Sequence, residues 1–202
     1  YNRINKTLRS ELNRMRPEWP FLEKNNNPDQ IITSDYKWII DPLDSPNNLK
    51  HGIPHFCIST AVKYNEEIVA AVIYDPMRDE LFMSEKGSGA FLNHRRIRVS
   101  SRQSLNDSII AVNINNFEYK MTNSLIKTIK SISDKKAEIR LQGSSALDLA
   151  YVASGRYEGF WSENMNIWNF SAGSLMIKEA GGTITNITGK NEYLLDLPIL
   201  AT

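Results

Sequence analysis

The feature that most constrains the fold is a series of short apolar segments between residues 56 and 99. Two strand-like runs, residues 56–64 and 68–75, are separated by the turn signal Asn65-Glu66-Glu67. Shorter runs follow at residues 80–83, 90–92 and 97–99. Because consecutive strands joined by short turns pair with their neighbours, the sequence predicts an antiparallel meander in the first half of the chain.

The second half alternates strand-like and helix-like segments. Strands are expected at residues 107–113, 137–141, 157–161, 183–187 and 199–202, and helices at 119–132, 146–153 and 169–180. A further helix is expected near the start, at residues 5–15, where Leu8, Leu12 and Met15 share one face. We predict one compact unit, with an N-terminal half (1–105), a C-terminal α/β half (106–202) and the functional site at their junction.

An acidic segment interrupts the pattern before the meander. Trp38-Ile39-Ile40 reads as a buried strand, and Asp41-Pro42-Leu43-Asp44 follows it. Since Pro42 removes a backbone donor, we expect the strand to end and the two acids to leave the sheet on a turn. Two carboxylates with a carbonyl between them suit magnesium, manganese or calcium. An ordinary Asx-turn, in which the acids accept backbone amides, is the alternative.

Composition narrows the function classes. The 24 basic and 23 acidic residues give a formal net charge of +1, which supplies no bulk field to attract nucleic acid or an anionic membrane. The single cysteine, Cys57, excludes an internal disulfide and is typical of a reducing compartment. The longest apolar run, residues 68–74, is too short to span a bilayer. We expect a soluble cytoplasmic protein without direct nucleic-acid or membrane contact.

Three blocks of the sequence form a known pattern. The first runs from Trp38 to Asp44 and continues with Asn48 and His51-Gly52-Ile53-Pro54, and the second is Glu85-Lys86-Gly87-Ser88-Gly89-Ala90. The third runs from Gly143-Ser144 through Leu147-Asp148-Leu149-Ala150 to Trp168-Asn169 and Glu179-Ala180-Gly181-Gly182. In order and spacing these blocks resemble the inositol monophosphatase family, and especially its bacterial extragenic-suppressor branch.

The resemblance implies a layered α-β-α-β-α sandwich, an α/β fold with a large antiparallel sheet in its first half and mixed α/β structure in its second. It also implies a homodimer and Mg²⁺-dependent hydrolysis of a small phosphorylated polyol. In that chemistry bound metal ions activate a water, hold the phosphoryl oxygens and neutralise the leaving alkoxide.

The family's site residues can be carried over position by position. Its metal-binding and catalytic acids match Asp41 and Asp44, with the carbonyl of Leu43, and its acid ahead of this motif matches Glu23. The amides that hold phosphate match Ser45 and Pro46, the substrate-lining turn matches Gly143, Ser144 and Ser145, and further substrate contacts match Ser162 and Asn169. The position of Asn169 also completes the family's second metal site.

Several of these positions depart from the family pattern. Ser45-Pro46 replaces Gly-Thr, so a positive φ at Ser45 would cost about 1 kcal/mol, and Pro46 removes a hydroxyl and an amide donor. Loss of one such donor lowers turnover on the order of 100- to 1000-fold. Asn169 and Ser162 replace acids, and Lys24 replaces the second glutamate of a pair.

Two functions follow from this pattern. One is a weakened phosphomonoesterase that holds one magnesium with Glu23, Asp41, Leu43 and Asp44. The other is a catalytically inactive member that acts as a protein-binding accessory factor of the transcription machinery, as the extragenic-suppressor resemblance implies.

Nearby histidines and serines have simpler interpretations. With no cysteine or further histidine at ligand spacing, His51 and His55 are expected to make backbone hydrogen bonds rather than hold metal. Ser144 and Ser145 precede a helix and are expected to cap it rather than act as nucleophiles.

Overall fold

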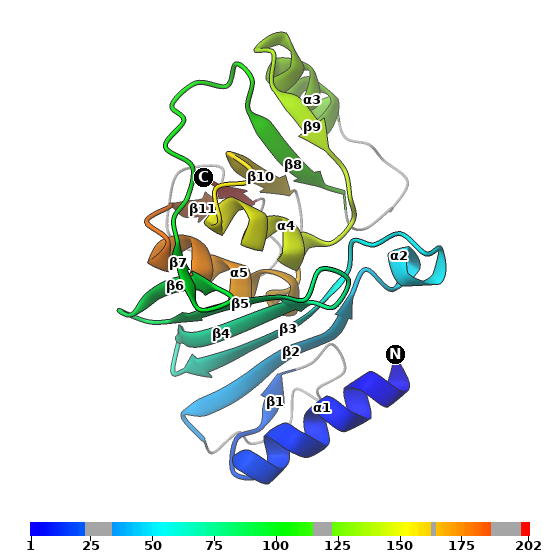
Figure 1. Cartoon of the computed structure of the whole chain (residues 1–202), viewed down its shortest axis with the longest axis vertical. Coiled ribbons are helices and arrows are strands. Elements are labelled where there is room, and N and C mark those ends of the chain that lie inside the picture. Colours follow the sequence, from blue (N-terminus) through cyan, green and yellow to red (C-terminus); the bar gives the residue numbers. More distant parts are fainter. Residues whose placement is uncertain (23–33, 115–122, 163–164, 187–198) are drawn as a thin grey trace.

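The chain folds into five layers, in the order helix, sheet, helix pair, sheet, helix (Figure 1). The computed structural model describes residues 1–22, 34–114, 123–162, 165–186 and 199–202. α1 (Asn2–Met15) and α3 (Asn123–Asp134) form the outer layers, and α4 (Ser145–Ala153) and α5 (Ile167–Glu179) lie between the two sheets. The predicted α-β-α-β-α architecture is therefore confirmed. Among the described residues, no helix combines the length and apolarity needed to cross a membrane.

The larger sheet contains seven strands in chain order. They are β1 (Phe21–Leu22), β2 (Tyr36–Asp44), β3 (Cys57–Tyr64), β4 (Glu67–Asp75), β5 (Glu80–Glu85), β6 (Gly89–Leu92) and β7 (Arg95–Ile97). Strands β2 to β7 pair antiparallel, which confirms the predicted meander, and β1 joins β2 in parallel. Asn65 and Asp79 adopt the left-handed conformation that tight hairpin turns favour.

The smaller sheet has five strands in the order β11-β12-β10-β8-β9. Their bounds are β8 (Ile109–Asn113), β9 (Glu138–Arg140), β10 (Gly159–Ser162), β11 (Ile184–Asn186) and β12 (Ile199–Ala201). β8 pairs in parallel with both β9 and β10, whereas β12 is antiparallel to β10 and β11. This half is mixed α/β, as predicted.

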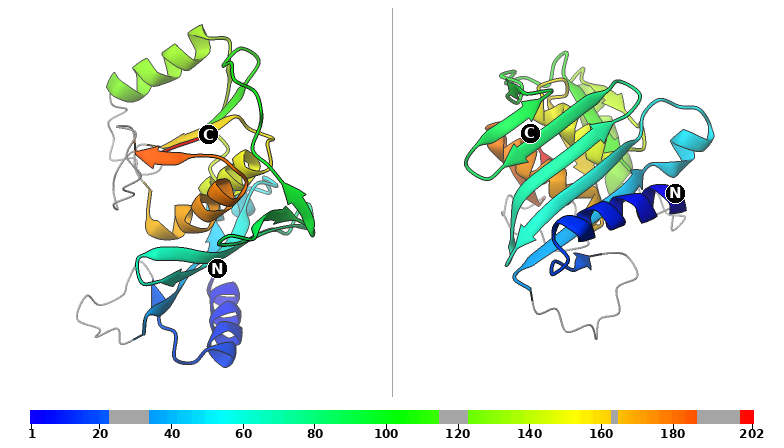
Figure 2. Two further views of the ribbon diagram at one scale, coloured as in Figure 1. Left: turned by 90° about the vertical axis from the view of Figure 1, so that its left-hand side faces the viewer. Right: turned by 60° about the horizontal axis from the view of Figure 1, so that its bottom comes forward.

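The helix pair lies between the two sheets (Figure 2), and one apolar core connects the sheets across it. It includes Ile39 and Phe82 from the larger sheet and Phe160 and Ile184 from the smaller one. The two central helices approach closely at Gly173, where an added Cβ would lie 2.4 Å from the Cβ of Leu149.

The outer helices cover the remaining face of each sheet. Leu8 and Leu12 of α1 pack against Trp38, Ile40 and Val62 of the larger sheet. On the smaller sheet, the side chains facing α3 are Ile110, Val112 and Trp161, which pack with Ile129 and Ile132. Each sheet therefore presents one face to the common core and the other to an outer helix.

The acidic segment departs from the sequence prediction. β2 does not end at Ile40 but continues to Asp44, so the two acids do not leave the sheet on a turn. Asp41 is opposite Ser59 and Asp44 is opposite Cys57, with a register shift between them. Pro42 and Leu43 thus form a β-bulge, and a bulge is one of the few places where a sheet tolerates the missing amide of proline. A short helix that the sequence did not predict, α2 (Pro46–Lys50), follows almost at once.

Candidate functional site

The bulge in β2 brings both acids to the same face of the sheet. In a regular strand, residues three apart point to opposite faces. Asp41 follows Ile39, a member of the common core, by two residues, and the extra residue of the bulge aligns Asp44 with Cys57, which is also in that core. Asp41 and Asp44 therefore both face α4 and α5 rather than α1.

Asp41 is held between its own strand and α5. Its Oδ1 accepts a hydrogen bond from the Leu43 amide at 3.2 Å, and its Oδ2 accepts one from the Asn169 side-chain amide at 2.9 Å. Asn169 lies in the first turn of α5, and both side chains are buried. The first bond is the Asx-type contact that the sequence offered as an alternative to metal binding.

Asp44 is anchored at the beginning of α4. Its Oδ2 accepts hydrogen bonds from the Ser144 hydroxyl and from the Ala146 amide, both at 2.8 Å. Ser144 does occupy the N-cap position of α4, as predicted, but its side chain makes no capping bond within the helix. Instead the carboxylate of Asp44, about a hundred residues earlier, takes the place of the capping side chain. Ser145 lies within the first turn of the helix and is buried.

Burial makes both acids difficult to ionise, and the charge of Asp41 adds to this effect at Asp44. Burial raises the pKa of Asp41 to about 6, against the opposing effect of its bonds with Leu43 and Asn169. Burial, followed by the charge of Asp41, raises the pKa of Asp44 to about 7. Among the described residues, neither carboxylate forms an ion pair with a lysine, arginine or histidine. Within the part of the chain that the structure describes, the two acids thus have no positively charged partner.

The loop after Asp44 has a strained first residue. Ser45 adopts a left-handed conformation with φ of 63° and is the N-cap of α2, with Pro46 at the first helical position. A residue with a Cβ in this conformation costs about 1 kcal/mol or more relative to glycine. The positive φ on which the expected strain at Ser45 depends is therefore present.

Asn48 fixes this loop against the predicted substrate-lining turn. Its side-chain amide donates to the carbonyl of His55 at 2.6 Å and to the carbonyl of Gln142 at 2.7 Å. The next residue, Gly143, has a φ of 85°, and a Cβ added there would lie 3.5 Å from Ser45 Oγ. The structure therefore brings Ser45 and Gly143 together, although nearly a hundred residues separate them in sequence.

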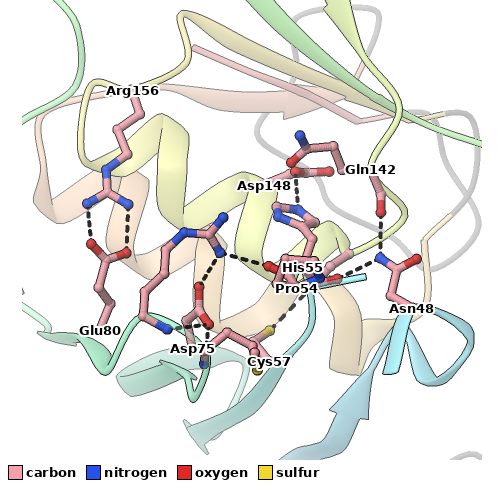
Figure 3. A network of polar contacts seen from close by, with 12 residues as sticks. Asn48, Pro54, His55, Cys57, Asp75, Glu80, Gln142, Asp148 and Arg156 are labelled. Atoms are coloured by element: carbon pink, nitrogen blue, oxygen red, sulfur yellow. Dashed lines mark hydrogen bonds and ion pairs between the residues drawn. The ribbon is translucent and has the colours of Figure 1, made fainter. Parts of the chain in front are cut away.

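A network of buried polar side chains lies beside the site (Figure 3). His55 Nε2 lies 2.9 Å from Asp148 Oδ1, and both side chains are almost fully buried. Nearby, Asp75 is fully buried and accepts a hydrogen bond from Arg78 at 2.9 Å. The prediction of backbone hydrogen bonds holds for the carbonyl of His55 but missed its side chain, which pairs with α4 instead.

Not every predicted site residue can be placed. Glu23 and Lys24 lie outside the described residues. Ser162 is fully buried at the end of β10, and only four residues separate it from the start of α5, the helix that carries Asn169. The site as described therefore consists of Asp41, Asp44 and Asn169 together with the nearby segments.

The donors present suit one hard divalent cation. Asp41 and Asp44 supply two carboxylates, Leu43 between them adds a backbone carbonyl, and oxygen donors of this kind are those magnesium prefers. A cation would also offset the effect of burial that raises both pKa values and the charge of Asp41 that raises the pKa of Asp44 further. The described residues contain no cluster of three or more histidines, cysteines or acids that could hold a metal. Asn169 adds no charge, so the set does not support a second cation.

Between the two sheets, a buried acidic pair faces the first turns of two helices. This arrangement defines a class of layered α/β proteins with a polar site between their sheets. A sequence model of the Inositol monophosphatase family matches residues 1–202, and the chain belongs to this family.

Similar proteins carry two kinds of name. The chain is 41% identical over 187 residues to an inositol-1-monophosphatase of Rhizobium meliloti, covering 93% of this chain and 70% of that protein. It is 42% identical over 163 residues to the Nus factor SuhB of Pseudomonas aeruginosa, covering 80% of this chain and 60% of that protein. The crystal structure of the extragenic suppressor protein suhB from Bartonella henselae superimposes with a TM-score of 0.91 at 40% identity, over 99% of this chain and 77% of that one. The chain thus spans 60–70% of the length of the two named relatives.

Proposed function

We propose that the chain is a Mg²⁺-dependent phosphomonoesterase that acts on a small phosphorylated polyol with reduced turnover. The observation that carries the proposal is the acidic pair of Asp41 and Asp44, buried together on one sheet face without a positive side chain among the described residues. Family membership and the inositol-1-monophosphatase relatives support the reaction class. The proposal includes Glu23 as a third acid, a homodimeric assembly and a cytoplasmic location.

In this mechanism the protein mainly positions groups. Asp41 and Asp44, with the Leu43 carbonyl, would hold one magnesium, which would supply Lewis acidity toward a water and the phosphoryl oxygens. The bonds from Ser144 and Ala146 fix the orientation of Asp44 at 2.8 Å, and Asn169 fixes Asp41 at 2.9 Å. The phosphate is expected to bind beside Ser45, Pro46 and the turn of Gly143, Ser144 and Ser145. Asn48, which ties this loop to that turn, keeps the two sides of the pocket together.

The same residues account for the reduced turnover. Pro46 has no amide with which to bind a phosphoryl oxygen and no hydroxyl with which to orient a water. Asn169 directs a neutral amide at Asp41 where an acid would add charge for a second cation. Ser162 and Lys24 also replace acids of the family pattern.

The proposal is tested by measuring Mg²⁺-dependent phosphate release from inositol 1-phosphate. We expect release that exceeds that of an Asp44→Ala control, and no excess over this control would refute the enzymatic proposal. The double variant Pro46→Thr with Asn169→Asp should raise turnover about 100-fold, because it restores a hydrogen-bond donor and a metal charge. An unchanged rate would show that the pocket no longer serves this reaction.

A second candidate is a non-catalytic accessory factor that binds transcription proteins. It is favoured by the combination of Pro46 and Asn169, and by relatives named Nus factor SuhB. Binding to purified RNA polymerase and elongation factors, measured by calorimetry, distinguishes the two. Binding that Asp44→Ala leaves unchanged, with no phosphate release by the wild type, would favour the accessory role.

A further inference from the structure

The loop between β2 and β3 is anchored at both ends to the beginning of α4. At its start, Asp44 Oδ2 accepts two hydrogen bonds of 2.8 Å, one from the N-cap residue and one from the first turn of that helix. At its end, His55 Nε2 lies 2.9 Å from Oδ1 of Asp148, which also belongs to the first turn of α4 (Figure 3). We call residues 45–54 the phosphate-side loop, because it contains two of the proposed phosphate contacts.

The position of His55 is passed on to the middle of this loop. The backbone carbonyl of His55 accepts a hydrogen bond of 2.6 Å from the side-chain amide of Asn48. The same nitrogen of Asn48 donates to the carbonyl of Gln142 at 2.7 Å, next to the turn at Gly143 (Figure 3). The spacing between the phosphate-side loop and this turn therefore depends on where the His55 carbonyl lies, and the side chain of His55 determines that place.

Stability alone does not account for the pair of His55 and Asp148. The exposed fractions of the two residues are 4% and 1%, and Asp148 Oδ2 is buried without a hydrogen-bond partner among the described residues. Buried pairs of this kind are often no more stable than apolar residues of similar volume. A hydrogen bond fixes both a distance and a direction, however, whereas an apolar contact is non-directional. The pair is thus better suited to fixing a position than to adding stability.

A second clamp holds the same segment from the other side. Arg78 Nη1 donates to the carbonyl of Pro54 and to the fully buried carboxylate of Asp75, both at 2.9 Å. This clamp does not involve the side chain of His55. Replacing the pair of His55 and Asp148 is therefore expected to loosen the loop locally while the rest of the protein stays folded.

We propose that His55, held by Asp148, is a positioning residue that fixes the phosphate-side loop against the turn at Gly143. The inference rests on the proposed function, and it adds to it the residue that preorganises the phosphate pocket. Without the pair, the loop occupies its binding position only part of the time. The apparent affinity for the phosphate ester falls with that fraction, whereas the bound complex reacts as before. KM should therefore rise while kcat stays nearly constant.

The central test is the double variant His55→Phe with Asp148→Ala. It removes both polar partners, keeps nearly the same combined side-chain volume and retains a ring beside Tyr151, whose centroid lies 5.8 Å from that of His55. Tm should stay within about 4 °C of the wild type. With inositol 1-phosphate and magnesium, KM should rise about 10-fold and kcat should change less than about 2-fold. A purely structural role predicts the opposite, since a smaller folded fraction lowers the apparent kcat and leaves KM unchanged.

Two single variants complete the comparison. Asp148→Asn keeps an oxygen that can accept a hydrogen bond from His55, so it should restore KM to within about 2-fold of the wild type. The matched control is Arg156→Leu, which removes another pair of the same network, Arg156 Nη1 with Glu80 Oε2 at 2.7 Å (Figure 3). Neither residue of this pair belongs to the phosphate-side loop or to α4. Arg156→Leu should lower Tm and leave KM unchanged.

Proteolysis reports the position of the loop without an enzymatic assay. Lys50 is exposed at the end of α2, within the phosphate-side loop, and local opening presents the bond between Lys50 and His51 to trypsin. Cleavage of this bond, followed by mass spectrometry, should be about 10-fold faster in the double variant and should return to the wild-type rate in Asp148→Asn. Cleavage after Lys135, which is exposed next to α3, is the internal reference and should be equal in all proteins.

An unchanged KM in the double variant, or an equal rise in KM in Asp148→Asn or in Arg156→Leu, would overturn the inference. So would a double variant that no longer folds, because the pair would then be structural. If the wild type releases no phosphate, the proposed function fails, and proteolysis alone decides the inference. Faster cleavage after Lys50 in the double variant but not in Asp148→Asn would support the positioning role. Equal cleavage after Lys50 in the wild type and the double variant would overturn it.

Discussion

Replacing Asp44 with asparagine should stabilise the magnesium-free protein at neutral and alkaline pH. Burial and the charge of Asp41 raise the pKa of Asp44 to about 7, whereas its ordinary value is 3.8. Between these values the folded protein binds a proton that the unfolded chain does not. The free energy of unfolding therefore falls as pH rises from about 4 to 7, and the full penalty applies above pH 7.

The magnitude follows from the difference between the two pKa values. From 3.8 to about 7, at 1.36 kcal/mol for each pH unit, the penalty is about 4 kcal/mol. Both hydrogen bonds to Asp44, from Ser144 and Ala146, go to the same oxygen, so the single carbonyl oxygen of asparagine can accept both. Its added amide group costs about 1–2 kcal/mol if it finds no acceptor. The net gain of about 2–3 kcal/mol corresponds to a rise in Tm of roughly 4–12 °C.

The assay is thermal unfolding of wild type and Asp44→Asn at pH 5 and pH 8, with EDTA and with magnesium. The variant should be more stable than the wild type in EDTA at pH 8, and the difference should shrink at pH 5, where Asp44 is protonated. Magnesium should stabilise the wild type more at pH 8 than at pH 5 and should have little effect on the variant, because a cation neutralises the same charges.

Asp75→Asn is the matched control. Asp75 is also fully buried, but it has a positive partner in Arg78 at 2.9 Å, so its replacement should lower Tm at both pH values. A lower Tm for Asp44→Asn in EDTA at pH 8 would refute the reasoning. So would a magnesium effect that is independent of both pH and Asp44.

Three further predictions concern the core and the polar network. His55→Ala should lower the free energy of unfolding by about 3 kcal/mol in urea titrations, because it leaves the buried charge of Asp148 unpaired. The loss should be larger at pH 8 than at pH 5, since burial raises the pKa of Asp148. As the control, the exposed variant His51→Ala should change the free energy of unfolding by less than about 0.5 kcal/mol. Gly173→Ala should cost about 1–3 kcal/mol, since the new Cβ meets the Cβ of Leu149 at 2.4 Å. Most of the cost should remain when Leu149→Ala is present as well, because alanine keeps that Cβ. Cys57 should resist thiol-labelling reagents until the protein unfolds, because it is fully buried and burial raises the pKa of its thiol; fast labelling of the native protein would contradict this.

Much of the fold could be predicted from local patterns. The meander follows from apolar runs separated by turn residues, and the helix at α5 follows from its apolar face and the Gly181-Gly182 stop. These signals act over a few residues, which is the range that sequence patterns report. The bulge at Pro42 and Leu43 escaped prediction because proline at a strand end and proline within a bulge produce the same local pattern.

The partners within the site were harder to predict. The acids Asp41 and Asp44 were recognised from their spacing and from the family resemblance. The bond from Ser144 to Asp44 and the pair of His55 with Asp148 join residues 100 and 93 positions apart, and no local pattern specifies them. The predicted Ser162 shares its sheet face with two buried residues that the sequence did not indicate, Asn113 and Asn186, because this arrangement becomes visible only when the register of four strands is known.

The bulge in β2 also determines which genetic changes this segment can accept. Its single extra residue lets Asp41 and Asp44, three apart in sequence, share a face, so deleting either Pro42 or Leu43 would restore regular pairing and leave Asp44 opposite Cys57 on that same face. A one-codon deletion elsewhere in β2 would instead shift the register and turn side chains to the other face. A deletion scan across β2 should therefore find its most tolerant step at the bulge, with Pro42 better tolerated than Leu43, whose side chain is buried.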